Sequence, residues 1–138
     1  MARRRAKRPP AQRLILDSGA VIALARQDAR ARAALTAAWE VGADVIVPAV
    51  VVAETVRGTA RDVPVNRILN AVGNVAPSTE ETARTAGALL ARAKSAATID
   101  ALVVAEAVHR GGGVVLTGDA EELGSLASPH AEVVIQSL

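Results

Sequence analysis

Four acidic residues in this 138-residue chain stand in stretches that are otherwise apolar. Asp17 and Asp119 each come at the end of a short aliphatic run, whereas Glu54 and Asp100 interrupt aliphatic stretches of helical composition. The apolar residues around these acids predict buried or half-buried side chains at all four positions. A carboxylate loses free energy on burial unless a cation or hydrogen-bond donors accompany it. These four acids therefore indicate a site where carboxylates share a positively charged partner.

A divalent metal ion is the partner that fits these acids best. Converging carboxylates without a cation would repel one another and raise one another's pKa values. Ligation by oxygen alone favours Mg²⁺, with Mn²⁺ as a substitute, over zinc. The chain has no cysteine, and His109 and His130 lie outside the four acidic segments. A metal held by carboxylates can activate water and neutralise charge on a phosphate, so phosphodiester hydrolysis without a covalent nucleophile is the expected chemistry.

The two acids at strand ends also have structural explanations. Asp17 or Ser18 could cap the helix that follows, and Asp119 with Glu122 fits the capping-box pattern. Taken one at a time, these explanations are as good as the functional one.

The two acids in helical stretches have structural explanations as well. Asp100 falls in the first turn of an expected helix, where the helix dipole favours an acid. Glu54 is neither a cap nor near a helix start, so its structural partner would be Arg57, three residues later. Taken together, the four structural explanations are weaker than the functional one, because a single shared site accounts for all four acids at once.

Short aliphatic runs alternate along the chain with longer Ala-rich stretches that favour helix. Strands are expected at residues 13–16, 44–47, 74–76, 114–116 and 132–135. Helices are expected at residues 18–26, 28–41, 49–57, 62–71, 78–95 (with a Ser78/Glu81 capping box), 98–110 and 119–126. This alternation predicts one α/β domain with a mostly parallel five-stranded sheet. In such sheets ligands bind beyond the carboxyl ends of the strands, where the four acids would meet.

Composition and charge limit the class of protein further. Hydrophobic residues make up 51% of the chain, Trp39 is the only aromatic residue, and the core must be aliphatic. The absence of cysteine excludes disulfides and thiolate metal sites and suits a reducing compartment. No apolar run is long enough to span a membrane, so we expect a cytoplasmic protein. Residues 1–13 carry a charge of +6 and the rest of the chain −4, so the tail is expected to be a disordered extension or a polyanion-binding segment.

Four segments in order, LILDSGAVIAL, PAVVVAETVRG, TIDALVVAEA and VVLTGDAEEL, resemble the signature segments of PIN-domain ribonucleases. The resemblance is to the VapC-type toxins of type II toxin–antitoxin pairs and spans residues 14–138. It implies a three-layer α/β/α domain, metal-dependent cleavage of single-stranded or loop RNA, an antitoxin partner and, as in many relatives, a homodimer.

The resemblance also assigns individual residues. Asp17, Glu54, Asp100 and Asp119 correspond to the family's acidic cluster, Ser18 and Thr117 to its neighbouring hydroxyl residues, and Glu122 to an additional acid. We expect Asp17 and Asp100 to be the principal metal ligands, and Asp119 to bind metal through water or to bind a second ion. Glu54 would be a ligand or would organise the attacking water.

Contacts to RNA must rely on phosphates, because the chain has no Phe or Tyr to stack on bases. Arg26, Arg57, Arg61 and the tail are the candidates for these contacts. A receiver domain is disfavoured because its early pair of acids is missing, and a haloacid-dehalogenase-type phosphatase because residue 19 is glycine. The remaining alternative is a PIN-fold module that binds RNA or protein without cutting or without a toxin role.

Overall fold

Five short aliphatic segments form one parallel sheet in the computed structural model, which describes residues 12–138. The strand order is β3-β2-β1-β4-β5, and every neighbouring pair is parallel. The strands are β1 (Arg13–Leu16), β2 (Asp44–Pro48), β3 (Val75–Ala76), β4 (Gly113–Thr117) and β5 (Val133–Ser137). Of the basic tail, residues 1–11 lie outside the described residues, and Arg13 opens β1.

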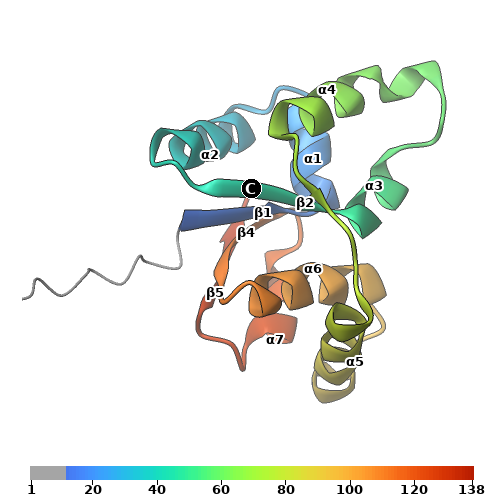
Figure 1. Cartoon of the computed structure of the whole chain (residues 1–138), viewed down its shortest axis with the longest axis vertical. Helices are drawn as coiled ribbons and strands as arrows, with labels where there is room; N and C mark the ends of the chain where they lie inside the picture. Colours follow the sequence, from blue (N-terminus) through green and yellow to red (C-terminus); the bar gives the residue numbers. More distant parts are fainter. Residues whose placement is uncertain (1–11) are drawn as a thin grey trace, which may run out of the picture.

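Helices cover both faces of this sheet (Figure 1). The α-helices are α1 (Ser18–Ala25), α2 (Ala29–Glu40), α3 (Ala49–Thr55), α4 (Val63–Val72), α5 (Glu80–Ala93), α6 (Thr98–His109) and α7 (Ala120–Ala127), and η2 (Ala60–Asp62) is a 3₁₀ turn. Helices α1, α2 and α4 lie on one side of the sheet, and α5, α6 and α7 lie on the other. The prediction of a three-layer α/β/α domain is confirmed.

The chain changes direction across the sheet between β1 and β4, which creates a switch point. From β1 the chain moves outward to β2 and β3, and it then returns to place β4 and β5 on the other side of β1. The β1–β4 register pairs Leu16 with Leu116, so the residues that follow these two lie side by side at the carboxyl end. The Asp17 amide donates to the Leu116 carbonyl at 3.2 Å. This is the edge at which the sequence predicted the acids to meet.

The core is aliphatic, as expected. The side chains with almost no exposed surface include four on the central strands, which are 0–1% exposed and pack between the sheet and the helices: Ile15, Leu16, Ile46 and Leu116. Rigid packing around β1 and β4 fixes the strand ends, so side chains just beyond them have defined positions. No helix in the stretch 12–138 has the length and apolar character to cross a membrane.

Two expected helices, 49–57 and 78–95, were wrong by two residues at one end or both. Helix α5 is capped by Thr79 rather than Ser78: the Thr79 hydroxyl accepts a hydrogen bond from the Thr82 amide at 3.1 Å, and both glutamates after it lie in the first turn. Helix α3 ends at Thr55, not at Arg57. The amides after that helix bind the side chain of Asp62 instead of continuing the helical hydrogen bonds.

Candidate active site

Asp17 lies just beyond β1, where it both caps α1 and faces the switch point. Its Oδ1 accepts a hydrogen bond from the Ala20 amide at 2.8 Å, so the expected structural role is real. The carboxylate is also 5% exposed, and this burial raises its pKa. Hydrogen bonds from the Thr117 hydroxyl and from the Ala20 and Gly118 amides lower the pKa but do not outweigh burial. A buried carboxylate that these donors do not fully stabilise is suited to binding a cation.

Thr117, the last residue of β4, links the two strand ends. Its side chain is fully buried, and its Oγ1 accepts a hydrogen bond from the Asp119 amide at 2.8 Å. The same hydroxyl hydrogen-bonds to the Asp17 carboxylate. Thr117 therefore holds the backbone of Asp119 and the side chain of Asp17 in one arrangement.

Asp100 comes from the first turn of α6, on the other side of the sheet from α1. Its half-buried carboxyl has a pKa raised to about 6, first by burial and then by the negative charges of Asp17, Asp119, Glu54 and Glu122. The structure thus brings the other predicted acids within electrostatic reach of Asp100. The charged neighbours with the largest effect on Asp100 are all carboxylates.

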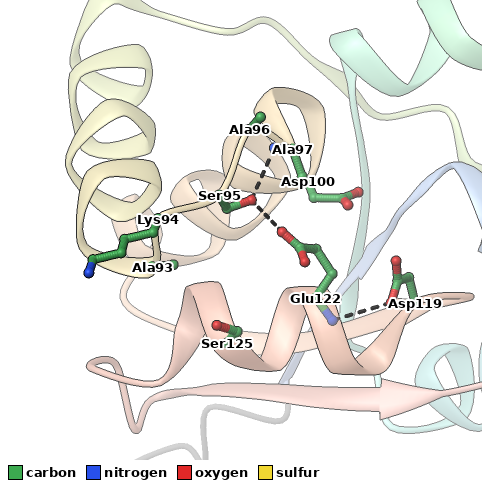
Figure 2. Close-up of a pocket in the computed structure, with 9 residues that line it drawn as sticks. All are labelled: Ala93, Lys94, Ser95, Ala96, Ala97, Asp100, Asp119, Glu122 and Ser125. Carbon is green, nitrogen blue, oxygen red and sulfur yellow. Dashed lines mark hydrogen bonds between the residues drawn. The ribbon is translucent and has the colours of Figure 1, made fainter.

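Asp119 and Glu122 form half of the expected capping box. Asp119 Oδ1 accepts a hydrogen bond from the Glu122 amide at 3.2 Å. The return bond is not made, because the Asp119 amide is held by Thr117 and the Glu122 carboxylate accepts a hydrogen bond from Ser95. Figure 2 shows Asp100, Asp119 and Glu122 lining one pocket from α6, the start of α7 and α7 itself, with the Glu122 carboxylate directed toward Ser95. The capping explanation accounts for the backbone of α7 but not for the Glu122 side chain.

Glu54 does not pair with Arg57. It accepts a hydrogen bond from the Ser18 hydroxyl at the start of α1, which joins α3 to the Asp17 side of the site. Arg57 instead donates through Nη1 to the carbonyls of Ala53 and Val56 at 3.0 Å each. Glu54 and Asp119 are exposed, so the expectation that all four acids are at least half-buried was wrong for these two.

The acids open onto a pocket of about 500 Å³. Asp100, Asp119 and Glu122 form its acidic wall, and the α5–α6 connection with Lys94 and Ser95 forms the opposite side. A pocket of this size and polarity suits a polar ligand at the carboxyl edge of the sheet.

The donor chemistry of the site fits a hard divalent cation. Among residues 12–138, no three acidic or histidine side chains are close enough to form a closed metal site in the present arrangement. The groups around Asp100 are nevertheless carboxylates and hydroxyls, the oxygen donors that Mg²⁺ and Mn²⁺ prefer. Their mutual repulsion is the kind that a bound cation offsets.

The structure separates the three arginines suggested as RNA contacts. Arg57 and Arg61 are exposed and line one pocket of about 460 Å³ just after the helix that carries Glu54. Arg26 follows the last turn of α1, whose first turn is capped by Asp17. An eight-residue helix is about 12 Å long, so Arg26 lies at the far end of α1 from the acids.

Sequence reasoning missed three structural contributors. Gly19 lets the start of α1 approach the loop after β4 closely, and the paired Asp-Ser-Gly and Thr-Gly-Asp segments were the available signal. Ser95 binds Glu122 from the α5–α6 connection and had no signal in its own segment. Asp62 is 5% exposed and accepts hydrogen bonds from the amides of Arg57, Gly58 and Thr59. These amides lower the pKa of Asp62 and fix the loop that carries the two arginines.

Comparisons with known proteins agree with this architecture. The family model of the PIN domain matches residues 14–127. Three similar solved structures are FitAcB from Neisseria gonorrhoeae, VapBC2 from Rickettsia felis bound to a DNA fragment from their promoter, and a toxin–antitoxin complex from Klebsiella pneumoniae. Their sequence identities are 21%, 10% and 21%, with TM-scores of 0.62, 0.71 and 0.67. The alignments cover 88%, 91% and 88% of this chain and 95%, 98% and 95% of the matched chains.

No protein with a curated function matches the sequence. At these identities the solved structures establish the fold, whereas the family model spans most of the chain and both strand ends that carry Asp17 and Asp119. The chain belongs to the PIN domain family.

Proposed function

We propose that this chain is a metal-dependent endoribonuclease that cleaves single-stranded or loop RNA, with Mg²⁺ as its metal and Mn²⁺ as a substitute. The observation that supports the proposal best is that Asp17 and Asp119 follow adjacent parallel strands at the switch point, and that their charges reach Asp100 and raise its pKa. Asp17 caps α1, Asp119 caps α7 and Asp100 lies in α6, so no single helix cap explains why the charges of the first two act on Asp100. Membership of the PIN family adds support, since PIN domains are typically nucleases.

Asp17, Asp100 and Asp119 would hold the metal. A divalent cation bound there supplies the charge that activates water and stabilises the negative phosphate. Glu54 orients the attacking water and accepts its proton, and the Ser18 hydroxyl holds Glu54 toward the Asp17 side of the site. Thr117 keeps Asp119 in place through its backbone amide, and Glu122 adds a further carboxylate to the pocket.

RNA would be held through its phosphates, with little stacking on aromatic side chains. Arg57 and Arg61 lie nearest to the helix of Glu54 and are positioned by the loop that Asp62 organises. Arg26 would contact only RNA that runs past the far end of α1. The acidic pocket repels a phosphate until a cation is bound, so metal and RNA are expected to bind cooperatively.

We further propose that the protein is the toxin of a toxin–antitoxin pair and acts in the cytoplasm. One of the three similar structures is a toxin–antitoxin complex from Klebsiella pneumoniae, which supports a cognate antitoxin as partner. Such a partner would place a basic side chain near the acids and cover aliphatic surface. A homodimer is proposed as well, on the resemblance to the family.

The direct test is cleavage of a single-stranded RNA by the purified chain with Mg²⁺ or Mn²⁺, with EDTA as the metal-free control. We expect D17N and D100N to reduce cleavage by more than about 100-fold, because loss of a ligand should cost more than loss of a second-shell contact. Undiminished cleavage by both variants would refute the site. RNA binding without cleavage by the wild type would favour the non-catalytic alternative.

The toxin role has a separate test. Expression of the chain alone should arrest growth, and co-expression of a small protein encoded by the adjacent gene should restore it. Normal growth with an active nuclease would refute the toxin role and leave the enzymatic proposal intact.

A further inference from the structure

We propose that Ser95 is a positioning residue that holds the Glu122 carboxylate at the acidic pocket. This inference rests on the proposed function, since it assigns Ser95 and Glu122 to the metal-binding site of the nuclease. The capping of α7 does not require such a contact, because the cap is made by the backbone amide of Glu122 and not by its side chain.

The contacts of Ser95 orient its hydroxyl. Ser95 lies in the connection between α5 and α6, and its Oγ accepts a hydrogen bond from the Ala97 amide at 3.0 Å. The same hydroxyl donates to Oε1 of Glu122, 27 residues along the chain (Figure 2). A carboxylate only accepts, so the hydroxyl donates its proton to Glu122 while one of its lone pairs accepts from the Ala97 amide.

Glu122 needs such a tether because its neighbours repel it. Its carboxylate shares the pocket wall with Asp100 and Asp119, and the charge of Glu122 helps to raise the pKa of Asp100. A half-buried glutamate has several rotatable bonds and can move its charge away from two other carboxylates into water. The hydrogen bond from Ser95 opposes this movement.

The same arrangement occurs on the opposite side of the site. Ser18 donates to Glu54 across 36 residues, as Ser95 donates to Glu122 across 27. Each serine ties a long acidic side chain to a neighbouring element, while the shorter Asp17 and Asp119 are held by caps and by Thr117. Ser95 therefore has a role that matches that of Ser18, and each serine holds one glutamate of the proposed site.

Binding of Mn²⁺ to the purified chain, measured by calorimetry, tests the proposal without relying on activity. We expect S95A to weaken Mn²⁺ binding by about tenfold, the lower range for loss of a second-shell contact. S95T keeps the hydroxyl and should retain most of the affinity. In an E122A background, S95A should have no further effect, because Ser95 acts through Glu122. The matched control is S78A, which removes an exposed serine outside the site and should bind Mn²⁺ like the wild type.

The outcomes separate this inference from the function on which it rests. Equal Mn²⁺ binding by the wild type, S95A and E122A, with RNA cleavage intact, would overturn the role of Ser95 and leave the nuclease proposal standing. An S95A effect of the same size in the E122A background would also overturn it, because Ser95 would then act independently of Glu122. A wild-type chain that neither binds Mn²⁺ nor cleaves RNA would overturn both proposals.

Discussion

Gly19 and Gly118 pack backbone against backbone, so that a Cβ atom on Gly19 would lie 3.0 Å from the Gly118 amide nitrogen and 3.1 Å from its Cα. This close approach brings the first turn of α1 against the loop between β4 and α7. The Gly118 amide can then reach the Asp17 carboxylate, to which it donates a hydrogen bond. The distance between the two strand-end loops thus depends on the absence of a side chain at residue 19.

Replacing Gly19 with alanine sets two effects against each other. Alanine favours the helix by about 1 kcal/mol over glycine. The new methyl group, however, meets backbone whose amide is already engaged by Asp17, and overpacking of this kind costs about 1–3 kcal/mol. We expect G19A to lower stability by about 1 kcal/mol in urea unfolding and to reduce RNA cleavage through displacement of Asp17.

G118A is the matched control for this prediction. A Cβ atom on Gly118 would lie 3.5 Å from the Gly19 Cα and 3.8 Å from Leu138 Cδ1, which are ordinary contact distances. We expect G118A to keep both stability and activity. A G19A variant that is more stable than the wild type and fully active would contradict the prediction. It would show that the two loops can move apart to admit the methyl group without loss of stability or displacement of Asp17.

The strands were predictable because their physical signal is local. Aliphatic runs bounded by turn residues placed every strand within two residues of its position, and β1 at its observed bounds. The rule that parallel strands end at one edge then predicts that Asp17 and Asp119 lie at the same edge. Both steps use only neighbouring residues and the topology of a parallel sheet.

What the sequence could not predict depends on tertiary contacts. Apolar neighbours of Glu54 suggested burial, but they do not reveal that its side of α3 faces solvent. Ser95 and Glu122 meet across 27 residues, and nothing in either segment encodes the pairing. Ser78 and Thr79 are adjacent, equally suitable caps, and only the backbone path into α5 selects Thr79. The metal ligands and RNA contacts stay predictions until they are measured.

Asp62 should control the loop between α3 and α4. Its buried carboxylate accepts hydrogen bonds from the amides of Arg57, Gly58 and Thr59, so D62A leaves these amides without their acceptor. We expect D62A to lower the melting temperature and to speed tryptic cleavage after Arg57 and Arg61 several-fold. D44N, which changes an exposed aspartate at the start of β2, should leave the digestion rate unchanged.

The pH dependence of this loop follows from the same contacts. The amides hold the pKa of Asp62 below its ordinary value of 3.8, so the stabilisation is complete above that value and is lost as the pH falls through the folded-state pKa. Tryptic digestion cannot follow this at low pH, but thermal melts of the wild type and D62A can. A pH-independent difference between D62A and the wild type would contradict the role of the charged carboxylate.

Arg57 and Arg61 should contribute more to RNA binding than Arg26. Each contact to a single-strand phosphate accounts for about 0.7 in the slope of log affinity against log salt concentration. We therefore expect R57A and R61A each to reduce that slope by about 0.7, measured with D100N to prevent cleavage. R26A should change it less, since Arg26 lies at the opposite end of α1 from Asp17. An equal loss in all three variants would indicate that RNA runs along the full length of α1.

Asp100 should make the metal-free protein less stable as the pH rises. Burial and the charges of Asp17, Asp119, Glu54 and Glu122 raise its pKa from 3.8 to about 6. Between these values the folded chain binds more protons at Asp100 than the unfolded chain, so its contribution to stability falls from pH 4 to pH 6. We expect D100N, which carries no charge, to be more stable than the wild type above pH 6 in EDTA.

Thermal melts of the wild type and D100N from pH 4 to pH 8 test this prediction, and the difference between them should vanish near pH 4. Added Mn²⁺ should raise the melting temperature of the wild type above pH 6, where the carboxylates are charged, and should have little effect on D100N. A wild type that equals D100N at every pH in EDTA would mean that the carboxylates do not repel one another in solution. In that case the electrostatic reason for a cation at this edge of the sheet would be lost.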